Sequence, residues 1–113
     1  MAHDPELAAK LERALSARAE ISEKRMMGGI CYFVNGNMIG GADRAKDGTR
    51  RFMFRIGKEN SGQAERIGGG EPMIQGDRVM PGFFFVDADC CDDARLWQWV
   101  ELALAFAKSL PAK

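Results

Sequence analysis

The amino-acid sequence predicts a single α+β domain in which helices cover a mainly antiparallel sheet, as a two-layer sandwich. Helical periodicity of apolar residues occurs near both ends of the chain, and short apolar segments of strand type lie between them. The strand segments are joined by short turns, which is typical of antiparallel pairing. The 113 residues fit one domain, 1–113, of which we expect about residues 5–110 to be ordered.

The first predicted element is an amphipathic helix over residues 5–20. Asp4 can accept hydrogen bonds from the free N–H groups at the helix start, and Pro5 suits the first helical position. Apolar side chains then recur at spacings of three and four between Leu7 and Leu15. This spacing predicts one stripe that faces a core.

A hairpin follows, with strands at residues 30–34 and 38–39. Between them stands Asn35-Gly36-Asn37, and Asn-Gly tolerates the positive φ values of a tight type I′ turn. The second strand weakens at Gly40-Gly41, and the polar residues 43–50 are expected to form a loop.

The third strand is predicted at residues 51–56 from strict alternation. One face carries Phe52, Phe54 and Ile56, and the opposite face carries Arg51, Met53 and Arg55. Such a strand is half-buried, with one side turned to the core.

A short helix is predicted at 59–67, ended by three consecutive glycines. A short strand at Met73-Ile74, a turn at Gly76-Asp77 and a strand at 83–86 follow. The last of these is apolar on both faces, and strands of that kind are normally covered on both sides. The expected order is therefore helix, three strands, helix, two strands, helix.

The final helix is predicted at 92–109, and it is apolar around most of its circumference. Such a helix needs a second partner surface besides one sheet face. Aromatic side chains are enriched at interface centres, so Trp97, Trp99 and Phe106 are candidates either for the core or for a contact between two copies.

Several motifs resemble the N-terminal domain family of TfoX-type competence regulators. The longest is KRMMGGICYFVNGNM at 24–38, where Met27 replaces a Phe of many members, and FRIGKE follows at 54–59. Further matching segments continue in order: Pro72-Met73, Met80, GFFFVD at 82–87 and LALAFAKSLP at 102–111. The resemblance covers residues 6–111, nearly the whole chain.

The resemblance implies a secretion-chaperone-like α+β sandwich, often found as a dimer. In full-length competence regulators this domain precedes a C-terminal domain, and the pair acts with a transcription activator at competence promoters. We expect this chain to be a stand-alone member without that second domain. The family has no catalytic residues that could be transferred to this chain. The resemblance therefore supports an expected fold more strongly than an expected function.

Candidate chemistry is sparse. His3 is the only histidine and precedes the first helix, which leaves no complete catalytic constellation; we therefore expect no enzymatic activity and no cofactor. Asp89, Cys90 and Cys91 are candidate metal ligands, but adjacent cysteines lack the CxxC spacing of zinc sites. The alternative is that the acidic residues cap the last helix and the thiols fill small apolar spaces.

Basic residues are concentrated in the segment 44–58, where Arg51, Arg55 and Lys58 are candidates for contact with nucleic acid. The alternative is a solvated edge balanced by nearby acidic residues. The formal net charge of zero argues against attraction to nucleic acid or to anionic membrane as a property of the whole chain.

We expect a non-enzymatic regulatory or protein-interaction module that forms a homodimer. An odd number of cysteines and the lack of an export signal or long apolar run predict a cytoplasmic protein that does not enter the membrane. Two alternatives remain open: a nucleic-acid-associated transcription or competence regulator that uses residues 44–58, and a small-molecule- or metal-binding protein.

Overall fold

A computed structural model describes residues 3–26 and 28–113. Three α-helices, two 3-10 turns and six strands follow in order: α1 (Pro5–Ser16), β1 (Ser22–Met26), β2 (Gly29–Val34), β3 (Asn37–Arg44), β4 (Arg50–Arg55), η1 (Lys58–Asn60), α2 (Ser61–Ile67), β5 (Gly70–Gln75), β6 (Arg78–Asp87), η2 (Ala88–Cys90) and α3 (Asp93–Ser109).

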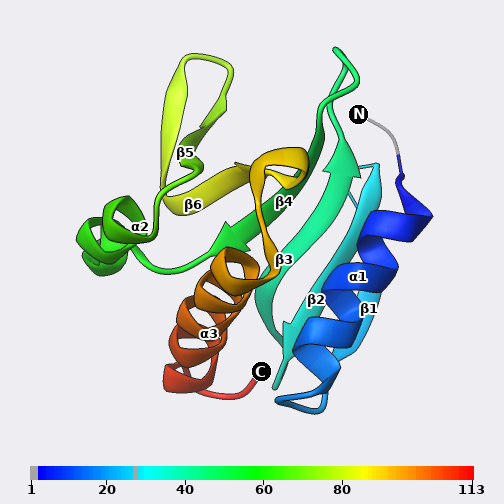
Figure 1. Cartoon of the computed structure of the whole chain (residues 1–113). Coiled ribbons are helices and arrows are strands. Elements are labelled where there is room, and N and C mark those ends of the chain that lie inside the picture. Colours follow the sequence, from blue (N-terminus) through cyan, green and yellow to red (C-terminus); the bar gives the residue numbers. More distant parts are fainter. Residues whose placement is uncertain (1–2, 27) are drawn as a thin grey trace.

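The strands form one sheet in the order β1-β2-β3-β4-β6-β5, with every neighbouring pair antiparallel. Figure 1 shows α1 and α3 crossing the same face of this sheet. An ion pair joins these helices, Lys10 to Asp93 at 3.4 Å, and Arg18, which follows α1, pairs with Glu101 of α3 at 3.6 Å. The α+β two-layer fold and its mainly antiparallel sheet are therefore confirmed.

The main core lies between this sheet face and the helices. It is built around Phe52, Phe54 and Trp99, all of which are fully buried. The Trp99 indole stacks on the Phe54 ring, with centroids 5.8 Å apart and an interplanar angle of 13°. Burial of large aromatic side chains is the main favourable contribution to a core of this size.

The predicted hairpin turn is confirmed. Asn35 and Gly36 have φ values of 54° and 79°, and Val34 pairs with Asn37 across the two-residue turn. The predicted alternation of β4 is also confirmed, because Phe52 and Phe54 belong to the main core while Met53 lies in a separate cluster on the other face.

The structure corrects several predicted boundaries and adds a strand. The first helix ends at Ser16 rather than near residue 20. The segment Ser22–Met26 forms β1, an edge strand. Sequence reasoning missed this strand because its side chains are mostly charged and exposed, so they show no alternation of apolar residues. The observed order therefore has four strands, rather than three, between the first two helices.

The expected loop over 43–50 is shorter than predicted, because β3 continues through Gly40-Gly41 to Arg44. The last strand is longer than predicted, since β6 begins at Arg78 and pairs with β5 around Gly76. The final helix starts at Asp93 with Asp92 as its cap, close to the predicted range.

The segment after α3 returns to the β2–β3 turn. The Asn37 side chain donates to the carbonyl of Pro111 at 3.0 Å, and the Lys113 N–H donates to the carbonyl of Asn35 at 2.8 Å. Among residues 3–26 and 28–113, no helix has the length and apolar character required to cross a membrane.

Candidate functional site

The sheet has a second apolar face, which we call the open face. Its apolar side chains form one cluster, and all of the clustered residues belong to strands: Met26, Cys31, Phe33, Met38, Met53, Met73, Met80, Phe83 and Phe85. Cys31, Met53 and Met73 are buried, and the other six are half-buried. The described helices pack on the opposite face and contribute no side chain to this cluster.

A pocket of about 210 Å³, here called the sheet pocket, lies in the open face. It is lined by residues of all six strands, including Met26, Cys31, Met53, Met73 and Phe85. Residues from both edge strands, β1 and β5, reach it although four strands separate them in the sheet. The sheet therefore curves around the pocket.

Two glycines in the pocket lining leave room for it. Gly41 pairs with Cys31 on one side and Met53 on the other, and both of those side chains belong to the open face. A Cβ atom on Gly41 would lie 2.5 Å from the Ile30 carbonyl oxygen, and one on Gly29 would lie 2.6 Å from that of Ala42. Contacts this short require the backbone to shift, so both positions need glycine.

An ion pair between β3 and β4 lies at the edge of the pocket. Arg51 Nε donates to Asp43 Oδ1 at 2.7 Å and Nη2 donates to Oδ2 at 3.3 Å, so the contact is bidentate. The two side chains are only 18% and 16% exposed. The Arg51 guanidinium also lies 3.8 Å from the centroid of the Phe85 ring, a cation–π arrangement.

The buried thiol of Cys31 faces the same pocket. Burial raises the pKa of Cys31, and the negative charge of Asp43 raises it further. Desolvation and a like charge both disfavour the thiolate. At neutral pH the Cys31 thiol is therefore protonated and packs as a small apolar group.

The predicted basic residues take different positions. Arg51 is the partner of Asp43, and Arg55 lies 5.3 Å from the ring centroid of Phe106 and 6.0 Å from that of Phe83. Lys58 is exposed in η1. Arg51 is thus neutralised by Asp43, whereas the Arg55 guanidinium lies near aromatic rings.

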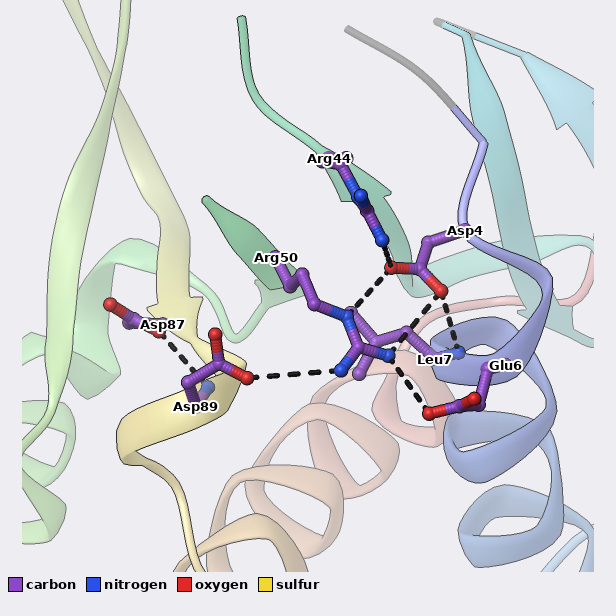
Figure 2. Close-up of polar contacts among 7 residues, drawn as sticks. All are labelled: Asp4, Glu6, Leu7, Arg44, Arg50, Asp87 and Asp89. Carbon is purple, nitrogen blue, oxygen red and sulfur yellow. Dashed lines mark hydrogen bonds and ion pairs between the residues drawn. The ribbon is translucent and has the colours of Figure 1, made fainter. Parts of the chain in front are cut away.

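Two further arginines of the same segment hold a buried carboxylate at the start of α1 (Figure 2). Arg50 Nε donates to Asp4 Oδ2 at 2.8 Å, and Arg44 Nη2 donates to the same oxygen at 3.0 Å. Asp4 also caps α1 by accepting from the Leu7 N–H at 3.1 Å. Hydrogen bonds from Arg50 hold the pKa of Asp4 well below its usual range, and they outweigh the opposing effect of burial.

Arg50 links three parts of the chain. Arg50 contacts Glu6 at 3.3 Å and Asp89 at 3.8 Å, besides Asp4 (Figure 2). Asp89 follows Asp87, whose carboxylate accepts from the Asp89 N–H at 3.0 Å. The candidate metal ligand Asp89 therefore neutralises an arginine.

The other candidate metal ligands, Cys90 and Cys91, lie in different environments. Cys90 is exposed, whereas Cys91 is buried with its Sγ 3.7 Å from the Asp92 carbonyl oxygen. Burial raises the pKa of Cys91. Asp92 caps α3 through the Arg95 N–H at 2.8 Å. In the described part of the chain, no three His, Cys, Asp or Glu residues are arranged to hold a metal ion.

The three aromatic candidates of α3 have separate environments. Trp99 is fully buried, and its Nε1 donates to the Gly68 carbonyl at 3.2 Å. Phe106 is half-buried beside Gly57. Trp97 is 53% exposed, and the Arg18 guanidinium lies 4.1 Å from its ring centroid. Of these three aromatic residues, Trp97 is the one with a largely exposed ring.

Sequence reasoning missed the sheet pocket itself. The alternation of β4 placed Arg51 and Met53 on one face, which was a partial signal. The contributions of Gly41, Cys31 and Met73 depend on the register of three other strands, which alternation within one strand does not determine.

Comparison with models of protein families matches residues 13–107 to the TfoX N-terminal domain. The matched range begins within α1 and ends within α3, so it includes the whole sheet. Neither the comparison with curated proteins nor that with solved structures gave a match.

Proposed function

Because the chain belongs to the TfoX N-terminal domain family, we propose that it is a regulatory protein-interaction module of the competence-regulator type, without catalytic activity and active as a homodimer. The observation that carries the proposal is the open face of the sheet. This face is rich in methionine and phenylalanine, and six of its nine clustered side chains are only half-buried.

An apolar sheet face of this kind favours binding of protein. Contiguous apolar patches on soluble domains usually mark interaction sites. Aromatic residues and methionine are enriched at interface cores, and methionine adapts its shape to a partner. The strand 83–86 fits this account, because its Phe84 side is buried in the main core while Phe83 and Phe85 contribute to the open face.

The proposed first partner is a second copy of this chain. Ile74 and Val79 pair across the β5–β6 hairpin and are 59% and 57% exposed, and Ile74 also lines the sheet pocket. The β5–β6 hairpin thus presents exposed apolar side chains next to the sheet pocket. A twofold dimer sets the same patch of each copy against the other, so an apolar patch can serve as its own complement.

In this proposal the regulatory contact is with protein rather than with nucleic acid. Arg44, Arg50 and Arg51 are each paired with a carboxylate within the chain. Non-specific affinity for nucleic acid depends on lysine and arginine that neutralise phosphates. Internal pairing therefore weakens the basic segment as a binding surface.

The proposal places the protein in the cytoplasm. Cys31, Cys90 and Cys91 are all free thiols. Free cysteines are typical of reducing compartments, where disulfides do not persist.

Size-exclusion chromatography with light scattering tests the dimer and its surface together. The wild type is expected to have the mass of a dimer at micromolar concentration. The double variant Ile74→Lys, Val79→Lys is expected to be monomeric, because lysine charges would have to be buried at the interface. The matched control is Trp97→Lys, which changes an equally exposed apolar residue on α3 and is expected to remain dimeric.

Two results would contradict parts of this proposal. A monomeric wild type across the micromolar range argues against the homodimer. A dimer that survives the hairpin substitutions and is lost in Trp97→Lys places the interface on α3 rather than on the open face. Circular dichroism of all three proteins establishes that the substitutions leave the fold intact.

A further inference from the structure

We propose that the sheet pocket binds a small, uncharged aromatic molecule of one or two fused rings. The inference does not rest on the homodimer, because all residues that line the pocket belong to one chain. It concerns a recess within the open face and assigns it a ligand of defined chemistry.

Backbone geometry sets the pocket lining at two positions. Gly29 and Gly41 contribute no side chain, and a Cβ atom at either position would lie within 2.6 Å of a carbonyl oxygen of the neighbouring strand. The hollow therefore does not depend on side-chain rotamers at these two positions. Pockets that are largely formed before the ligand arrives lose less conformational entropy on binding.

The size of the pocket selects a small ligand. Its volume is about 210 Å³, whereas an engineered apolar cavity of about 150 Å³ is known to bind benzene. Drug-sized ligands typically occupy pockets of about 300 Å³ or more. One aromatic ring or two fused rings match the sheet pocket, and larger ligands would extend out of it.

The walls favour an aromatic ligand over an aliphatic one. Met26, Met53 and Met73 bring three thioethers to the pocket, together with the ring of Phe85. Thioether sulfur makes favourable contacts with aromatic rings, and the unbranched methionine side chain adjusts to the shape of a ligand. Phe85 adds a surface for ring–ring contact.

The charges around the pocket favour a neutral ligand. Asp43 and Arg51 neutralise each other through a bidentate contact, and the guanidinium also lies against Phe85. An anionic or cationic ligand would have to compete with this pair and lose its own hydration. The protonated thiol of Cys31 likewise offers no charge to a ligand.

The methionine methyl groups provide a direct test by NMR on protein labelled with ¹³C at the methionine ε-methyl. The probe is 2-naphthol, which is neutral at pH 7, and 2-naphthoate is the charged probe with the same ring system. Binding in the sheet pocket is expected to shift the signals of Met26, Met53 and Met73 along one saturable curve, because ring currents act at short range. Met38 belongs to the open face but does not line the pocket, so its signal is the internal control.

The signal of Met80 reports on a different hollow of the molecule. Met80 lines a second hollow, between α2 and the β5–β6 hairpin, with Ala64 and Val79. The proposal requires that Met80 remain unshifted. A shift at Met80 without shifts at Met53 and Met73 assigns the ligand to that second hollow and overturns the inference.

A pair of matched substitutions tests whether binding occurs in the sheet pocket. Met73→Trp fills the pocket and is expected to weaken 2-naphthol binding about tenfold or more. Met38→Trp places the same ring outside the pocket and is expected to leave the affinity unchanged. Equal affinity for 2-naphthoate, or no saturable shift with either probe, would overturn the proposal.

Discussion

Arg50 Nε lies 2.8 Å from Asp4 Oδ2, and this bond joins the start of α1 to β4 across 46 positions of the chain. The Asp4 side chain is 3% exposed, so its charge depends on Arg50 and Arg44 for compensation. Loss of one member of a buried ion pair is costly because the other charge then lacks its partner. The pair therefore anchors the first helix to the sheet.

The Asp4 contact predicts a specific loss of stability. Asp4→Asn keeps an oxygen that can cap α1 but removes the charge, and it is expected to lower the free energy of unfolding by about 2 kcal/mol. Asp4→Ala also removes the cap and is expected to cost about 1 kcal/mol more. Urea unfolding at pH 7 measures both, with Glu65→Gln on the exposed side of α2 as the control.

The same contact predicts how stability depends on pH. The pKa of Asp4 in the folded chain lies below its ordinary value of 3.8, so the unfolded chain takes up a proton first as the pH falls. Stabilisation by Asp4 is therefore complete at neutral pH and is lost progressively below about pH 5. Urea unfolding between pH 7 and pH 3 is expected to show a steeper decline for the wild type than for Asp4→Asn. Parallel declines would contradict this role.

The two tryptophans of α3 are expected to respond very differently to truncation. Trp99→Ala removes a fully buried ring stacked on Phe54 and is expected to cost about 4 kcal/mol. Trp97→Ala removes an exposed ring that contacts Arg18, and it is expected to cost about 1 kcal/mol or less. Thermal unfolding monitored by circular dichroism compares them. Similar losses of stability for both variants would contradict this prediction, because they would require Trp97 to be buried.

Glycines at two sites are expected to respond with opposite sign to alanine. Gly41→Ala places a Cβ atom 2.5 Å from the Ile30 carbonyl oxygen and is expected to destabilise the protein by about 2 kcal/mol. Gly62 in α2 has open space around its Cβ position, so Gly62→Ala is expected to stabilise by about 0.5 kcal/mol through helix propensity. Denaturant midpoints report both signs in one experiment, and a tolerated Gly41→Ala would show that β3 can shift.

Nucleic-acid binding is expected to be absent. Fluorescence anisotropy with a labelled DNA duplex at low salt is expected to show no binding by the wild type, because Arg44, Arg50 and Arg51 are internally paired. The double variant Arg55→Glu, Lys58→Glu is expected to show no binding either. The same is expected of the double variant Arg51→Glu, Arg55→Glu if it remains folded. Binding that falls steeply with salt and is lost in these variants would support a nucleic-acid regulator instead.

The sequence was informative wherever local chemistry determines local structure. Asn35-Gly36 predicted the turn, and alternation from Arg51 to Ile56 predicted which side chains of β4 enter the core. The charged strand Ser22–Met26 was missed, since an exposed edge strand carries no apolar pattern. The continuation of β3 through Gly40-Gly41 was missed because glycine weakens a strand in isolation.

The candidate site could not be predicted from any single segment of the sequence. Cys31 and Met53 flank Gly41 only through the registers of β2, β3 and β4. The basic residues of 44–58 could be counted in the sequence, but their pairing with Asp4 and Asp43 required the folded arrangement. Met27, which belongs to the motif at 24–38, lies outside the described residues.

The position of α3 in the chain has a consequence for biosynthesis. This helix supplies Trp99, Val100 and Ala103 to a core whose sheet residues are all translated earlier. Until α3 emerges from the ribosome, Phe54 and Phe84 lack the Trp99 ring that contacts them. Such long-range contacts slow folding, and uncovered apolar strands invite aggregation or chaperone binding. The nascent chain therefore completes this core only once α3 is available to pack on the sheet.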